Sequence, residues 1–170
     1  MSPAALLMAH WLGALLLGAG LAYGTWAWHR VRRLERLAQD TRPTLQRLHR
    51  IYLISAVPGS LLLLASGGVL IATRHGWAGT VGQPWLLAML AVTLLEFTEG
   101  ITVTRHHLAR ALAGRSSAGD LAPHLDLPLY AAVLWLGITR PAGWWPVIAA
   151  LGVALGVALM AWRAARLGRY

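Results

Sequence analysis

Residues 4–26 read AALLMAHWLGALLLGAGLAYGTW, and residues 29–37, HRVRRLERL, carry five charged side chains. An apolar run of this length is enough to cross the ~30 Å hydrocarbon core of a bilayer as a helix. A cleaved signal peptide carries its positive charges before the apolar run, whereas here they come after it. We therefore predict a retained transmembrane helix with an external N-terminus.

The composition of the whole chain has the same character. Of the 170 residues, 57% are apolar and 12% are charged, against roughly 25% charged in an average soluble domain. The chain has no cysteine, which excludes disulfides and thiolate metal sites. The predicted fold class is all-α: a polytopic transmembrane helix bundle that forms a single domain, residues 1–170, with spans at about 4–26, 51–73, 85–104, 122–139 and 144–162.

The positive charges predict the orientation of this bundle. Thirteen of the fifteen arginines lie in segments 29–50 and 105–124 and in the C-terminal tail, and the other two are Arg74 and Arg140. The positive-inside bias then places the N-terminus outside and the C-terminus in the cytoplasm. Because the positive charges flank apolar spans, the net charge of +9 fits the lipid bilayer and anionic lipid head groups at the inner face, and not nucleic acid.

The basic segment 29–50 leaves two structures open. Its apolar residues recur at a spacing that suits a helix, either lying along the membrane surface or extending the first span, with a break at Pro43. A solvated basic hairpin is the alternative. We expect Trp26 and Trp28 to anchor the inner membrane interface.

Two pairs of glycines have a spacing that favours close helix packing. Gly20 and Gly24 are four residues apart, as are Gly152 and Gly156. Small residues at this spacing let two helices approach closely. The partner of each pair is either another helix of this chain or another subunit.

Acidic residues interrupt the third apolar segment, where residues 94–107 read LLEFTEGITVTRHH. Glu96 and Glu99 share a helix face, and Glu96 lies roughly 16 Å into its span. A carboxylate at that depth must face the interior of the bundle, where it pairs or shares a proton. We predict a proton or ion pathway through Glu96, Glu99 and His106. The alternatives are a protonated pair that holds helices together and an interfacial role for His106.

His10 is the histidine that lies clearly within a span, and it differs in depth from Glu96 by only about 7 Å. The two side chains can therefore line one cavity. A neutral imidazole in a membrane ligates a metal or a heme, relays protons or bonds across helices. Asp126 is either a helix cap or a functional acid. The sequence predicts no catalytic residue and no metal site beyond this.

Several segments together carry a family resemblance: AHWLGALLLGAG around His10, AVPGSLLLLASGGVLI, WLLAMLAVTLL and HLDLPLYAAVLWLGITRP. Over residues 5–141 the chain resembles an uncharacterised family of bacterial integral membrane proteins, related to HemJ-type protoporphyrinogen oxidases and CopD-type copper-resistance proteins. The resemblance implies the bacterial inner membrane, four helices to which the fifth is an addition, and His10 as a ligand of heme b. Met89 stands where the HemJ type has a lysine.

Three functions follow as hypotheses. In the first, the protein is heme- or tetrapyrrole-associated and handles redox equivalents and protons through a buried polar site. In the second, it is a non-catalytic accessory or assembly subunit with membrane-protein partners, which its small size and glycine-lined helices favour. In the third, it is a copper or small-ion permease, because intramembrane acids mark ion pathways.

Overall fold

The structure is a computed structural model, and it describes residues 2–99, 102, 105–114 and 122–167. Each secondary-structure element in these ranges is helical, which confirms the all-α class. The elements are α1 (Pro3–Arg36), α2 (Arg42–Ile51), the π-helix η1 (Tyr52–Ala56), α3 (Val57–Arg74), α4 (Gly76–Val81), α5 (Pro84–Glu99), α6 (Arg105–Leu112), α7 (Ala122–Thr139) and α8 (Trp144–Arg166).

The first helix, α1, is longer than the apolar segment that predicts it. It begins where the Ser2 hydroxyl accepts the backbone N–H of Ala5 at 3.2 Å, with Pro3 in the first turn. It then continues through the charged residues to Arg36, so its 34 residues measure about 51 Å. Of the predicted alternatives for this part of the basic segment, the structure shows an extension of the first span.

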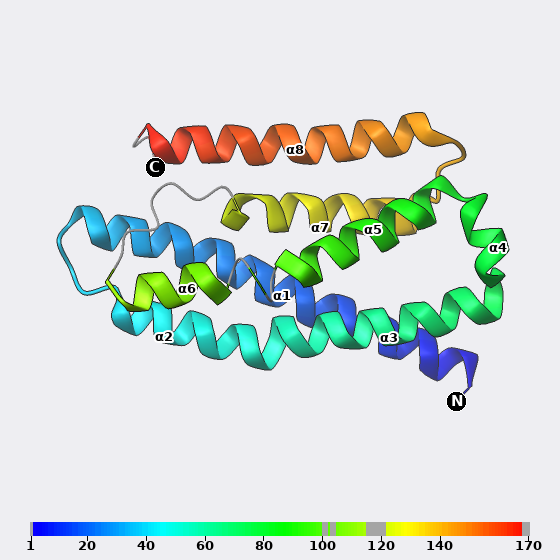
Figure 1. Cartoon of the computed structure of the whole chain (residues 1–170), viewed down its shortest axis with the longest axis horizontal. Coiled ribbons are helices and arrows are strands. Elements are labelled where there is room, and N and C mark those ends of the chain that lie inside the picture. Colours follow the sequence, from blue (N-terminus) through cyan, green and yellow to red (C-terminus); the bar gives the residue numbers. More distant parts are fainter. Residues whose placement is uncertain (1, 100–101, 103–104, 115–121, 168–170) are drawn as a thin grey trace.

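The next helix returns along α1. α2, η1 and α3 join without a break into one helix of 33 residues, Arg42–Arg74. Pro43 lies in the first turn of α2, where its missing N–H has no helical partner to lose. The two long helices form an antiparallel hairpin that turns at residues 37–41 (Figure 1).

Three helices are long and apolar enough to cross a membrane: Pro3–Arg36, Arg42–Arg74 and Trp144–Arg166. They correspond to the first, second and fifth predicted spans. The apolar part of α7, His124–Thr139, is shorter than a full span. α5 has 16 residues, and the end of the third predicted span, residues 100, 101, 103 and 104, lies outside the described ranges. The described residues therefore contain three candidate spans, and the count of five stays a prediction.

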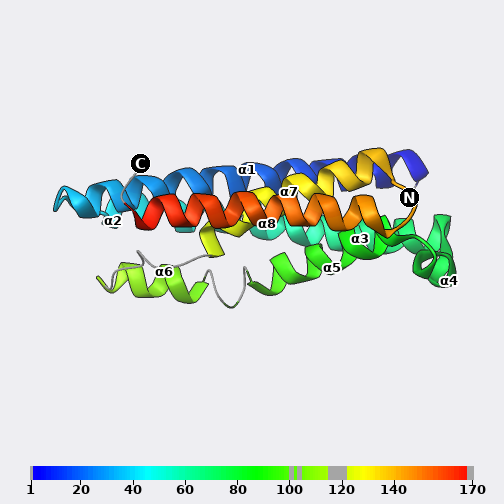
Figure 2. The same ribbon diagram turned by 90° about the horizontal axis from the view of Figure 1, so that it is seen from above.

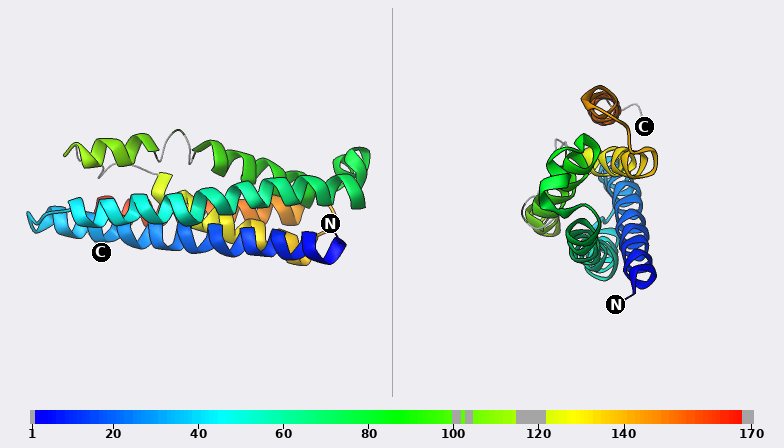
Figure 3. Two further views of the ribbon diagram at one scale, coloured as in Figure 1. Left: turned by 90° about the horizontal axis from the view of Figure 1, so that it is seen from below. Right: turned by 90° about the vertical axis from the view of Figure 1, so that its right-hand side faces the viewer.

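The five long helical segments run back and forth along one axis, so the two termini lie at opposite ends of the molecule (Figures 1 and 2). We call these the N-terminal end, where α4 and the α7–α8 connection also lie, and the C-terminal end, where α2 and α6 lie. α1 packs between α3 and α7, and α8 packs mainly on α7 at the outside of the bundle (Figure 3).

The start of α7 excludes one of the two roles predicted for Asp126. Because the helix begins at Ala122, Asp126 is not its cap, and Pro128 lies inside the helix. A proline at this place cannot donate the helical hydrogen bond to the carbonyl of His124. Asp126 is instead carried on the body of the helix, and its side chain lies in the bundle.

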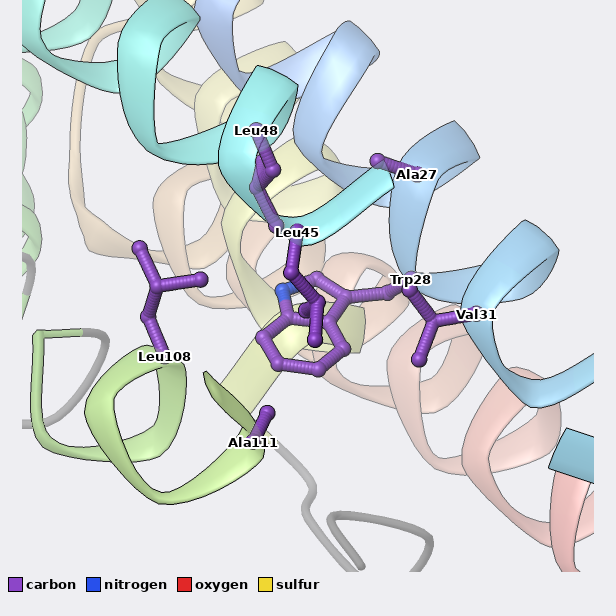
Figure 4. Packing of buried hydrophobic residues seen from close by; sticks show 7 residues of the cluster. All are labelled: Ala27, Trp28, Val31, Leu45, Leu48, Leu108 and Ala111. Atoms are coloured by element: carbon purple, nitrogen blue, oxygen red, sulfur yellow. The ribbon is translucent and has the colours of Figure 1, made fainter. Parts of the chain in front are cut away.

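An apolar core closes the C-terminal end of the bundle (Figure 4). It joins the last turns of α1 to α2 and α6 through Ala27, Trp28, Val31, Leu45, Leu48, Leu108 and Ala111. Trp28 is only 6% exposed, so the prediction that it anchors the membrane interface is wrong, whereas Trp26 is 50% exposed. The basic segment is thus a packed helical hairpin and not a solvated one, because its apolar stripe has α6 to cover it.

The helices α1 and α3 approach each other closely where they cross. A Cβ atom on Gly59 would lie 2.5 Å from the backbone nitrogen of Leu17, and one on Gly13 would lie 2.9 Å from the backbone nitrogen of Leu63. Gly20 belongs to the same seam, since its Cβ would lie 2.9 Å from that of Ala56. Close packing is thus confirmed for Gly20, and Gly13 and Gly59 were missed because they face each other across two helices.

We expect Gly59→Ala to lower the free energy of unfolding by about 1–3 kcal/mol, because the added methyl group meets backbone atoms that cannot rotate away. The matched control is Gly68→Ala on the same helix, where a Cβ meets nothing within 4 Å and alanine improves helix propensity. Thermal unfolding of the detergent-solubilised protein measures both. Equal midpoints for the two variants would contradict a tight α1–α3 seam.

Candidate functional site

A cavity of about 560 Å³ opens between α1, α3, α5 and α7. Its volume lies within the range of pockets that hold drug-sized ligands. Its walls are mostly apolar side chains, including Leu7, Leu63 and Leu134. The polar and charged residues in its lining are His10, Arg74, His75, Thr93, Glu96, Tyr130 and Arg140. His10 and Glu96 therefore line one cavity, as their depths in the sequence suggested.

His10 is held in one orientation by α3. Its Nδ1 lies 3.1 Å from the hydroxyl oxygen of Ser66, and that hydroxyl donates its proton to the carbonyl of Leu62. Ser66 has one proton to donate, so Nδ1 of His10 must be the donor to Ser66. This assigns the Nδ1–H tautomer and leaves Nε2 with the lone pair, the arrangement that a histidine needs to ligate a metal.

A glycine makes room for this imidazole ring. A Cβ on Gly67 would lie 3.3 Å from Cε1 of His10, closer than most side-chain contacts allow. Gly67 and Ser66 are neighbours on α3, so one turn of that helix supplies both the hydrogen-bond acceptor and the space. The sequence ASGG at residues 65–68 carries this information, but only the pairing of α1 with α3 shows that it faces His10.

Tyr130 joins α7 to the opposite side of α1. Its hydroxyl donates to the carbonyl of Ala14, and its ring lies where a Cβ on Gly18 would be, 2.7 Å from Cε1. Because Tyr130 also lines the large cavity, it both braces the wall and presents a phenol to the interior. Sequence reasoning missed this residue, since a tyrosine in an apolar helix has no distinctive signal.

Glu96 borders two cavities. It lines the large one, and it also lines a second space of about 30 Å³ together with Tyr52, Ser60, Glu99 and Asp126. This second space has room for roughly one or two water molecules. The three acidic residues Glu96, Glu99 and Asp126 therefore line one small space, and we call them the carboxyl cluster.

Three helices bring this carboxyl cluster together. Glu96 and Glu99 are one turn apart on α5, Asp126 comes from α7, and Tyr52 is the first residue of η1. A π-turn shifts the helix face on which the following side chains lie, and such turns are frequent at functional sites. The sequence grouped the two glutamates correctly, but the contribution of Tyr52 depends on the rotation of a helix about its axis.

His106 is the predicted pathway residue that the structure does not bring to these cavities. It lies on α6, where it is exposed, and it lines neither the large cavity nor the small one. The stripe of Glu96, Glu99 and His106 is therefore divided between the bundle interior and the surface at the C-terminal end. Its role in a pathway stays a prediction.

The described residues also limit what metal chemistry is possible. Within them, no three histidine, aspartate or glutamate side chains converge as a polydentate metal site would require. Met89 does line the cavity that contains His10, and its Cε lies 3.1 Å from where a Cβ of Gly137 would be. The possible donors in the cavity lining are thus the imidazoles of His10 and His75, the thioether of Met89 and the carboxyl group of Glu96. Because no three of the described histidine and acidic side chains converge, this lining suits a macrocycle that supplies the other ligands of its own metal.

Comparisons of this chain with protein-family models, with curated proteins and with solved structures each found no match. The resemblance to the HemJ and CopD types therefore stays a prediction. The geometry of the two cavities is the observation on which a function must be argued.

Proposed function

We propose that this chain is a five-span protein of the bacterial inner membrane, with its N-terminal end outside and its C-terminal end in the cytoplasm. Three helices of spanning length support this topology, as does the antiparallel path of α5 and α7 beside them (Figure 2). The arginines of α2 and α6 and those at the end of α8 lie together at the C-terminal end. An uneven charge of this kind orients a polytopic protein.

Single cysteines test this topology cleanly, because the chain has none of its own. Ala142 lies between α7 and α8, Ala113 follows α6, and both are exposed. In intact cells we expect a membrane-impermeant thiol reagent to label Ala142→Cys and to leave Ala113→Cys unlabelled until the cells are opened. The reverse pattern would overturn the orientation, and labelling of both from outside would overturn the five-span count.

We further propose that the large cavity binds a tetrapyrrole of the heme type, whose metal His10 would ligate. The observation that carries this proposal is the contact of His10 Nδ1 with the Ser66 hydroxyl, which leaves Nε2 available to bind a metal in an apolar cavity of ligand size. When bound, such a group supplies one-electron redox chemistry. The surrounding leucines exclude water from it.

The chain's own residues have separate tasks in this function. Ser66 orients His10, and Tyr130 holds the wall between α1 and α7. The carboxyl of Glu96 accepts or releases a proton at the edge of the large cavity. Glu99 and Asp126 then exchange protons with Glu96 through the small cavity that they share. This route runs from the large cavity toward the C-terminal end, so it couples the ligand to the cytoplasmic side.

We expect protein purified from heme-replete cells to show a Soret band that sharpens and shifts on reduction by dithionite. His10→Ala should abolish the band, and Ser66→Ala should weaken heme affinity by about 10–100-fold, because the ligand loses its orienting partner. His49→Ala, an exposed histidine on α2, is the control and should keep the band. A featureless spectrum from folded wild-type protein would overturn the heme proposal.

A second candidate function, an accessory subunit of a larger membrane complex, has its own support in α8. Cβ atoms on Gly152 and Gly156 would meet nothing within 4 Å, so this small-residue face is open within the described chain. We expect Gly152→Leu with Gly156→Leu to keep the thermal unfolding midpoint and to release any partner that copurifies in mild detergent. Purification of the wild-type chain alone under those conditions would contradict this candidate.

A further inference from the structure

Two arginines stand apart from the others in this chain. Thirteen of the fifteen arginines belong to the basic segments, and only Arg74 and Arg140 lie at the opposite end of the predicted bundle. The structure brings both into the lining of the same large cavity. Arg74 is the last residue of α3 and Arg140 follows α7, and both helices end at the N-terminal end of the bundle (Figure 1). Arg74 and Arg140 thus both line the end of the cavity that faces the N-terminal end of the bundle, which we call its mouth.

Arg140 occupies a backbone conformation that disfavours its own residue type. Its φ is +45°, in the left-handed region, where its N–H donates to the carbonyl of Leu136 at 2.9 Å and ends the helix. Glycine is the usual residue at such a helix end, because a side chain there is strained. Among the described residues, its guanidinium lies 5.8 Å from the centre of the Trp85 ring, and its Nε donates weakly to the carbonyl of Gly137 at 3.4 Å.

The charge of the cavity is strongly uneven along its length. Of the described lining residues, Glu96 is the one acid, and it lies twelve residues along α5 from Pro84, or about 18 Å from the N-terminal end. Arg74, Arg140 and His75 line the mouth, and the wall between mouth and Glu96 is largely apolar. The shape fits a ligand with a large apolar body and anionic groups at one end.

We propose that Arg74 and Arg140 bind the carboxylate side chains of the ligand, so that the cavity takes a tetrapyrrole dicarboxylate with its acidic edge at the N-terminal end. This inference rests on the proposed tetrapyrrole function and names the chemistry that selects and orients the ligand. A guanidinium binds a carboxylate through two parallel hydrogen bonds, so two arginines suit two carboxylates. The apolar edge of the ring then points toward Glu96, and His10 faces the ring from α1.

The test uses two probes that differ only in their carboxylates, protoporphyrin IX and its dimethyl ester. The full chain is placed in nanodiscs of uncharged lipid, and quenching of tryptophan fluorescence gives the Kd of each. The ratio of the two Kd values is compared between variants, because partition of the probes into lipid then cancels. We expect the wild type to favour the diacid by about tenfold or more.

Two variants separate the role of the charges from that of the fold. Arg74→Gln with Arg140→Gln should remove the preference and leave ester binding unchanged. Arg140→Gly should lower diacid affinity about tenfold while raising the thermal unfolding midpoint, because glycine adopts the positive φ without strain. Arg47→Gln with Arg50→Gln, two exposed arginines on α2, is the control and should change neither Kd.

The outcomes distinguish this inference from the function on which it rests. Equal binding of diacid and ester by the wild type would overturn the carboxylate site and leave a tetrapyrrole cavity standing. A preference that survives loss of both arginines would overturn it as well. Failure of the wild type to bind either probe would overturn the cavity ligand itself.

Discussion

The contact of the α1 backbone with that of α3 is the constraint on which the rest of the structure depends. At Gly13 and Gly59 no side chain separates the two helices, so their relative rotation and register have little freedom. That register continues in both directions along the pair. Toward the N-terminal end it brings Ser66 and Gly67 against His10, and toward the C-terminal end it brings Leu48 and Leu45 against the last turns of α1. Both the ligand cavity and the apolar core in Figure 4 follow from one helix crossing.

The two cavities differ in character because different helices close them. The large cavity lies between α1, α3, α5 and α7, and most of its wall consists of apolar side chains from these helices. The small cavity lies where Tyr52 on η1 approaches α5 and α7 and polar side chains replace leucines. Leu17, Thr93 and Glu96 line both cavities, and Glu96 is the acid among them. In the proposed function, this carboxyl group is what couples a ligand in the large cavity to the other carboxyl groups.

The lengths of the apolar segments and the positions of the charges predicted the helices of membrane-spanning length, which contain α1, α3 and α8. The same signals placed His10 and Glu96 at similar depth, because depth depends only on the helical rise. They failed where one helix must be rotated against another. Trp28 has the residue type and sequence position of an interface anchor, yet it packs against α2 and α6. Asp126 has the residue type of a helix cap, yet α7 begins four residues earlier. Tyr52 had no signal at all, since its position depends on a π-turn.

The length of α1 has a mechanical consequence. The helix measures about 51 Å, whereas a hydrocarbon core is ~30 Å thick, so in the proposed topology roughly 20 Å of it stands clear of the lipid tails. The end that would project carries Arg30, Arg33 and Arg36 and packs on α2 and α6, and the part that would be embedded carries His10. An uninterrupted helix transmits tilt from one end to the other. A force on the arginines, such as attraction to a charged lipid surface, therefore tilts the whole of α1. This tilt changes the position of the His10 imidazole in the large cavity.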